Sequence, residues 1–150
     1  METKRPIPEI FAEVVHRSDN CEFARRLGMV VTEIADGCVR VTMPTAGMKN
    51  GHGTVHGGAI FAIADHAFGI AGNLDEVEET GLSAHIRYFS PPAGGTLEAV
   101  ARRVAETERT SVYAVDVYSD GRPVASFEGI GFKVGAQMKR ARPLHLSADL

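Results

Sequence analysis

The chain has 150 residues, of which 23% are charged, and a formal net charge of -3, which indicates one ordinary domain and excludes an electrostatic basis for nucleic-acid binding. Its two widely spaced cysteines, Cys21 and Cys38, match no zinc spacing and favour a reducing compartment. No apolar run approaches the ~20 residues that span a bilayer and no signal-peptide core is present, so we expect a cytoplasmic protein without a membrane partner.

The N-terminal part of the chain is predicted to be helical. Residues 8–27 carry an apolar face at helical spacing and predict one or two short helices. Asp19 and Glu22 have the spacing of a capping box, which predicts the start of a second helical piece that Gly28 ends.

Strand-like patterns occupy most of the remaining chain. MVVTEI and CVRVTM flank Asp36-Gly37, the dipeptide of a tight hairpin turn. Four further strands are expected over residues 81–89, 96–106, 110–119 and 122–134, and Asp120-Gly121 predicts a second hairpin. Strands joined by such hairpins are antiparallel.

Between the two groups of strands lies HGGAIFAIADHAFGIAGN, residues 56–73, which is apolar nearly all round and predicts a helix enclosed on more than one side. The expected fold is therefore α+β, with a curved antiparallel sheet wrapped around one long central helix. Residues 28–135 would form this domain, 1–27 a helical segment of the same domain, and 136–150 a flexible tail.

Asp65 stands in the middle of this helix, and an unpaired buried carboxylate costs several kcal/mol, so it needs a partner or a task. At 3.6 residues per turn it shares a face with small residues such as Gly58 and Gly69, which predicts that it faces a narrow cleft. Gly57 and Gly58 begin the helix, where backbone N–H groups can polarise a carbonyl.

The length of the helix separates these two features. Asp65 lies ~12 Å along the axis from Gly57 at 1.5 Å per residue, whereas groups that act on one carbonyl must each be ~3 Å from it. If both act on the same carbonyl, a second subunit has to supply one of them, and two-fold pairing would make two identical sites.

The stretch NGHGTVHGGAIFAIADHAFGIAGN resembles the signature of hotdog-fold acyl-CoA thioesterases of the phenylacetic-acid-degradation type. That signature is an Asn-Gly-x-Gly-x-x-His-Gly-Gly loop followed by a helix with an Asp nine residues after the His. The matching positions are Asn50, Gly51, Gly53, His56, Gly57, Gly58 and Asp65. The order of helices and strands fits that fold from about residue 10 to residue 134.

The resemblance implies a role for each matching catalytic residue. Asp65 would attack the thioester or activate water as a general base, and the Gly57 N–H of the other subunit would polarise the thioester carbonyl. His56 would help to place the thioester, and Asn50 would orient water or the carbonyl. The alternatives are a structural Asp65, ordinary loop-ordering hydrogen bonds for His56 and Asn50, and packing for the two glycines.

The resemblance also implies a set of substrate contacts. An apolar tunnel between two helices, walled by residues such as Phe61, Ile63 and Phe68, would take the acyl group. Relatives often carry a small hydroxyl residue where this chain has His66, which would either tune Asp65, line the acyl pocket or serve as a core histidine. The full expected set is Gly58, Phe61, His66, Arg87, Ser90, Arg109, Thr110 and Ser111, the last five near the phosphates and adenine of CoA.

The function implied is hydrolysis of acyl-CoA thioesters, with aryl-acetyl or medium-chain acyl groups, by a dimer or tetramer with composite sites. No metal or redox cofactor is implied, CoA being part of the substrate. The predicted helix has no two histidines one turn apart, as a helical zinc site requires, because His52 and His56 belong to the loop before it. Two alternatives stay open: a hotdog-fold enoyl-thioester hydratase or dehydratase, and a non-catalytic acyl-CoA-binding module.

Overall fold

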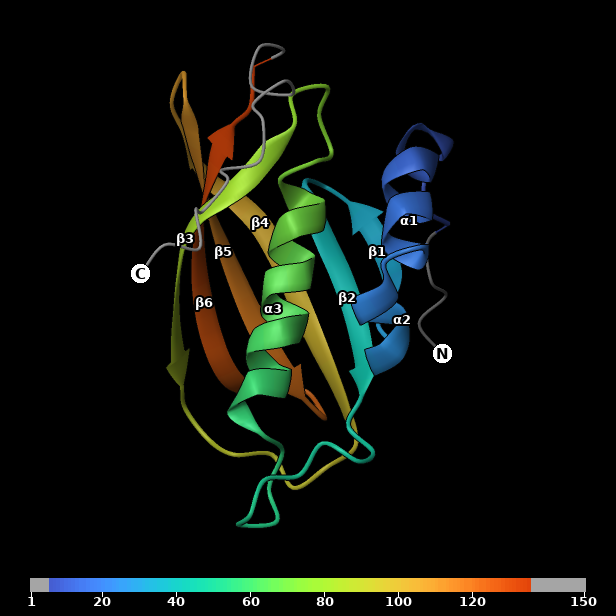
Figure 1. Ribbon diagram of the computed structural model, residues 1–150, viewed down its shortest axis with the longest axis vertical. Helices are drawn as coiled ribbons and strands as arrows, with labels where there is room; N and C mark the ends of the chain where they lie inside the picture. The colour runs from blue at the N-terminus through green and yellow to red at the C-terminus, as the bar shows by residue number, and fades with distance from the viewer. Residues whose placement is uncertain (1–5, 136–150) are drawn as a thin grey trace, which may run out of the picture.

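The computed structural model describes residues 6–135 and contains one antiparallel sheet with a long helix across its concave face (Figure 1). The α+β class expected from the sequence is confirmed. The sheet has six strands, β1 (Val30–Ala35), β2 (Cys38–Pro44), β3 (Glu79–Tyr88), β4 (Thr96–Glu106), β5 (Thr110–Ser119) and β6 (Arg122–Lys133). Their order across the sheet is β1-β2-β4-β5-β6-β3, and every neighbouring pair is antiparallel.

Short helices precede the sheet and pack beside β1 (Figure 1). They are the 3₁₀ helix Glu9–Phe11, α1 (Ala12–Asp19) and α2 (Glu22–Leu27). Gly28 ends α2 in the left-handed conformation at φ 70°, as expected. The predicted capping box is wrong: Asp19 belongs to α1, and the N-cap of α2 is Cys21, with no side-chain capping bond.

Two tight turns close the hairpins β1–β2 and β5–β6, as their sequences predict. Asp36 and Gly37 have φ values of 51° and 74°, and Asp120 and Gly121 have 49° and 75°. Two successive residues with positive φ are the hallmark of a type I′ turn, whose twist matches that of the flanking strands. The turns therefore fix the register of both hairpins.

β3 pairs with β6 at the sheet edge and not with β4, which follows it in the chain. The connection, residues 89–95, passes beneath the start of the long helix to reach β4 (Figure 1). There the Val55 N–H donates to the Pro92 carbonyl at 2.9 Å. This crossover brings the Ser90-Pro91-Pro92 segment to the N-terminal end of the helix.

The long helix, α3 (Gly57–Ala71), packs against the sheet through one side only. Its sheet-facing residues, such as Ile63 (0% exposed) and Phe68 (5% exposed), join the core formed by β2, β4, β5 and β6. The small-residue side, with Gly58, Asp65 and Gly69, is exposed in the protomer. The expected enclosure of the helix on more than one side is therefore not found within the protomer. Of the side that faces away from the sheet, α1 covers only one edge.

No helix within residues 6–135 is long and apolar enough to cross a membrane. Residues 136–150, expected to be a flexible tail, lie outside the described part of the chain.

Candidate active site

The loop before α3 is closed by Asn50. Its side-chain oxygen accepts hydrogen bonds from the backbone N–H groups of His52 (2.9 Å) and Thr54 (3.2 Å), and its amide nitrogen donates to the Thr54 hydroxyl at 3.0 Å. These bonds order the Asn-Gly-x-Gly turn. Asn50 therefore has the loop-ordering role that the sequence left as an alternative, and it also lines a pocket at the start of α3.

The first turn of α3 is capped by a histidine. His56 is the N-cap residue, and its Nδ1 accepts a hydrogen bond from the Gly58 N–H at 2.8 Å. A β-carbon on Gly58 would lie 2.9 Å from that nitrogen, so the bond requires glycine. The Gly57 N–H makes no hydrogen bond within residues 6–135. It is thus a free donor at the positive end of a helix.

A pocket of about 210 Å³ lies at this helix start. The structure brings together three of the expected residues here, Asn50, Gly57 and Ser90. The rest of the lining comprises Val55, Ile60, Tyr88, Phe89 and Pro91. Tyr88 and Phe89 were not expected from the sequence; their signal is an aromatic pair where a strand runs into Ser-Pro-Pro.

Asp65 lies elsewhere, on the outward side of α3 beside an open cavity of about 490 Å³ between α1 and α3. Its side chain is exposed on one side, while the cavity walls remove water from the other. This desolvation raises the pKa of the Asp65 carboxyl, and the neighbouring charge of His66 lowers it in part. A β-carbon on Gly69, one turn further along, would meet no atom within 4 Å, so the surface around Asp65 is unobstructed.

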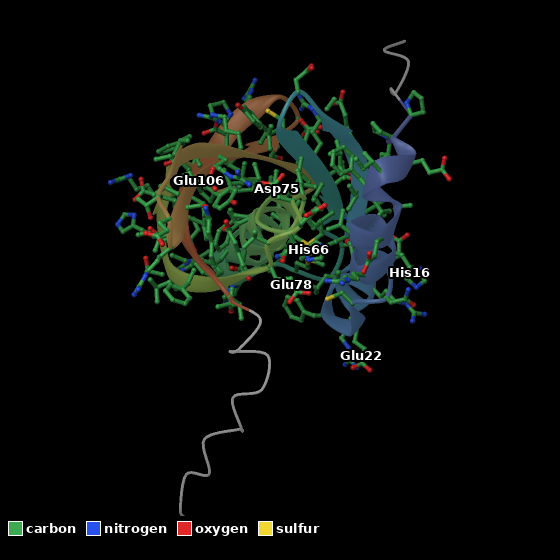
Figure 2. The ribbon with its side chains drawn as sticks, turned by 90° about the horizontal axis from the view of Figure 1, so that it is seen from above. His16, Glu22, His66, Asp75, Glu78 and Glu106 are labelled. Atoms are coloured by element: carbon green, nitrogen blue, oxygen red, sulfur yellow. The ribbon has the colours of Figure 1, made fainter. Side chains whose placement is uncertain are left out.

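His66 turns away from the open face and toward α1. Its Nε2 lies 2.9 Å from the Ser18 hydroxyl, and Figure 2 shows it between α3 and the N-terminal helices, with Glu78 nearby. Burial lowers the pKa of the His66 imidazole. His66 therefore both lines the cavity beside Asp65 and ties α1 to α3.

Gly57 and Asp65 line separate cavities in one protomer. The two sets of lining residues have no member in common. The separation follows from the ~12 Å of helix between the two positions. A single protomer consequently holds the free amide donor and the carboxylate in two separate cavities.

Two of the three residues expected to wall an acyl tunnel lie in the core of the protomer. Ile63 and Phe68 are core residues with almost no exposed surface. Phe61 is half-buried and packs edge-on against Phe127 at 5.5 Å between ring centroids. Ile63 and Phe68 point toward the sheet because they follow the helical period of the buried face, not that of Asp65.

The five expected CoA contacts do not converge. Ser111 is 0% exposed and donates to Glu79 at 2.6 Å, so it is buried away from any ligand. Arg87 precedes Tyr88, which faces α3, so alternation along the strand places Arg87 on the opposite face of the sheet. Arg109 and Thr110 lie at the β4–β5 turn, near the end of α3 opposite to Gly57, and of the five only Ser90 lines the pocket at the start of α3.

Within residues 6–135, no group of three or more His, Cys, Asp or Glu side chains is arranged to hold a metal ion.

Comparison with known proteins identifies the family. Residues 52–126 match the family described as the thioesterase superfamily. The acyl-coenzyme A thioesterase PaaI of Escherichia coli is 33% identical over 127 residues, which cover 83% of this chain and 89% of that protein.

Solved structures of similar proteins share the fold. The structure of Escherichia coli PaaI, from a phenylacetic acid degradation operon, has a TM-score of 0.78 and 31% identity and covers 84% of this chain and 94% of its own. A variant of the phenylacetic acid degradation protein PaaI of Thermus thermophilus has a TM-score of 0.71 and 38% identity, with coverage of 75% and 98%. The hotdog fold expected from the sequence is thereby confirmed.

Proposed function

This chain belongs to the thioesterase superfamily, and from that premise we propose that it hydrolyses acyl-CoA thioesters to a free acid and CoA, with Asp65 as the catalytic carboxylate. The observation that carries the proposal is Asp65 itself. It is an acidic side chain in the middle of an apolar helix, it is exposed in the protomer, and partial desolvation raises the pKa of its carboxyl. The Escherichia coli relative is named an acyl-coenzyme A thioesterase.

Asp65 can act in two ways, as a nucleophile or as a general base, and each route completes the hydrolysis. As a nucleophile, its carboxylate oxygen forms a bond to the thioester carbon, the carbon–sulfur bond breaks, and CoA leaves as a thiolate; water then hydrolyses the mixed anhydride. As a general base, it takes a proton from water, whose oxygen attacks the same carbon and expels the thiolate. Single-turnover hydrolysis in ¹⁸O-labelled water separates the two, because label enters Asp65 only in the first route, when water attacks the aspartyl carbon of the anhydride.

The oxyanion donor of the reaction is the Gly57 N–H of a second subunit. Two features of the protomer support this composite site: Asp65 and Gly57 line separate cavities, and the side of α3 that carries Asp65 is uncovered. A partner related by a two-fold axis would bring its Gly57 to this Asp65 and receive the reverse contribution. His56 and Asn50 would then border the thioester group from the partner's side.

The acyl group occupies the cavity between α1 and α3. The half-buried or buried side chains of Val14, Cys21 and Ile70 form the apolar part of its lining, and polar or charged residues such as Arg17 and Glu78 form much of the rest. The apolar part, in a cavity of about 490 Å³, leaves room for an aryl-acetyl or medium-chain acyl group. The Thermus relative, named for phenylacetic acid degradation, supports the aryl-acetyl member of this pair.

Replacing Asp65 with Asn tests the assignment. The variant keeps the shape of the side chain but loses the charge needed for attack or proton abstraction, so we expect kcat to fall about 10²-fold or more. Binding of acyl-CoA should persist. Release of thiol from a panel of acyl-CoA thioesters measures turnover, and an enoyl-CoA hydration assay in parallel tests the hydratase alternative. Unchanged turnover in Asp65→Asn would overturn the role of this residue.

A further inference from the structure

We propose that Tyr88 is a positioning residue that fixes the orientation and tautomer of His56 through the Gly57–Gly58 peptide group. The inference concerns the free protein; only its kinetic consequence rests on the proposed function. Neither the sequence motif nor the roles argued above involve Tyr88.

The geometry is a chain of two hydrogen bonds joined by one peptide group. The Tyr88 hydroxyl donates to the Gly57 carbonyl at 3.1 Å. The N–H of that same peptide group belongs to Gly58, and it donates to His56 Nδ1 at 2.8 Å. A hydrogen bond to a peptide oxygen polarises the N–H of the same group, so the two bonds strengthen each other.

The chain of bonds determines which ring nitrogen of His56 carries hydrogen. Because Nδ1 accepts from Gly58, it holds no hydrogen, and in the neutral ring the hydrogen must sit on Nε2. The His56 side chain is exposed, and Nε2 makes no hydrogen bond within the described residues. In the neutral ring, His56 therefore carries its one N–H donor at Nε2 of an exposed side chain.

Of the two glycines at the helix start, Gly58 is required by this arrangement, whereas a β-carbon on Gly57 would make an ordinary contact with Tyr88. The Tyr88 ring lies against Gly57, where a β-carbon would be 3.4 Å from Cζ and from the hydroxyl oxygen. On the other side, a β-carbon on Gly58 would strike the His56 ring at 2.9 Å. The side chains of Tyr88 and His56 thus clamp the first peptide group of α3 from β3 and from the cap.

Nuclear magnetic resonance of the substrate-free protein tests the chain of bonds directly. At alkaline pH, where imidazole rings are neutral, we expect ¹⁵N spectra to show hydrogen on Nε2 of His56 and a hydrogen-bonded Nδ1. In Tyr88→Phe, which keeps the ring and loses the hydroxyl, the Gly58 amide proton should move upfield and exchange faster with solvent. Tyr118→Phe is the matched control, because Tyr118 lies on the opposite face of the sheet, and it should change neither signal.

A double-mutant cycle on hydrolysis tests the consequence. One hydrogen bond is typically worth about fivefold in an equilibrium or rate, so Tyr88→Phe should lower kcat/KM about fivefold. If Tyr88 acts through His56, the same substitution in a His56→Ala background should have almost no further effect. A full fivefold loss in both backgrounds would show that Tyr88 acts independently of His56 and would overturn the proposal.

The two readouts separate this inference from the proposed function. Gly58 and His56 signals that do not change in Tyr88→Phe, or hydrogen on Nδ1 in the wild type, would refute the positioning role whatever the enzyme hydrolyses. The expected spectral changes in a protein that releases no thiol from acyl-CoA would instead support the chain of bonds and refute the hydrolase.

Discussion

Gly57 is the residue at which the proposed chemistry can be tested by removing one backbone N–H. It is the first residue of α3, where proline is well tolerated because the N–H has no helical partner. His56 before it already has φ -61° and ψ 135°, the extended conformation that a residue preceding proline adopts. A proline at this position would therefore delete the free N–H while leaving the helix intact.

We accordingly predict that Gly57→Pro keeps the fold and loses about 10²-fold in kcat, the usual cost of removing one oxyanion donor. Gly57→Ala is the matched control, since it introduces the same β-carbon beside Tyr88 but retains the N–H. Thiol release measures both variants, and circular dichroism checks the helix. Equal activities of the proline and alanine variants would show that the N–H has no catalytic role.

In the proposed reaction, the acid side of the pH profile reports on Asp65, whose ionised form would be the reactive one. Desolvation raises the pKa of Asp65 above the ordinary 3.8, so kcat/KM should fall as the pH drops through this raised value. The charge of His66 lowers the pKa of Asp65. Removing it in His66→Gln should therefore move the acid limb to higher pH. A limb that stays in place or moves to lower pH in this variant would exclude Asp65 as the group that titrates.

The sequence indicated candidate residues better than it indicated their contacts. Asp65 became a candidate because a carboxylate is costly in an apolar helix, and Gly57 because a glycine pair opens that helix. Ser111 could not be judged, since its burial against Glu79 depends on a pairing between distant segments. Tyr88 escaped notice because only the crossover of residues 89–95 brings the end of β3 under α3.

Among the helices, α2 is short, so its stability depends on the residues at its two ends. It has six residues and no side-chain bond at its N-cap, so its C-terminal stop at Gly28 matters to its stability. Gly28 has φ 70°, and a β-carbon there would lie 3.1 Å from the Pro44 ring.

Gly28→Ala should lower the free energy of unfolding by about 1 to 2 kcal/mol, because alanine is strained in the left-handed conformation. Urea denaturation measures the change. Gly51→Ala is a suitable control, since Gly51 has no positive φ and open space around its α-carbon, and it should stay within about 0.5 kcal/mol of the wild type. A loss no larger in Gly28→Ala than in this control would refute the argument.

The periodicity of the sequence predicted every strand and the long helix to within a few residues, because hairpin turns and apolar spacing are local signals. The place of β3 at the far edge of the sheet was not predictable in the same way. It follows from the β3–β6 pairing and from the path of the connection under α3, which are long-range packing choices. The capping box failed for a related reason: α1 continues through Asp19 and leaves Cys21 as the cap.

As a whole, the protomer leaves two surfaces uncovered that one partner could cover. The outward side of α3 carries Asp65 among small residues. The edge strand β3 has ten residues and exposes Leu82 (62%) and Tyr88 (51%), with Phe89 (58%) just beyond it. An exposed edge strand of this length readily pairs with another copy, which would extend the sheet and bring two α3 helices face to face.

Mixed oligomers of two inactive variants test the composite site most directly. Asp65→Asn and Gly57→Pro subunits would be co-expressed with different affinity tags and purified through both tags. The first subunit lacks the carboxylate and the second lacks the amide donor. If the carboxylate and the amide come from different subunits, every mixed dimer regains one intact site, and about half of the wild-type thiol release should return. Mixed oligomers that remain as inactive as their parents would contradict the composite site.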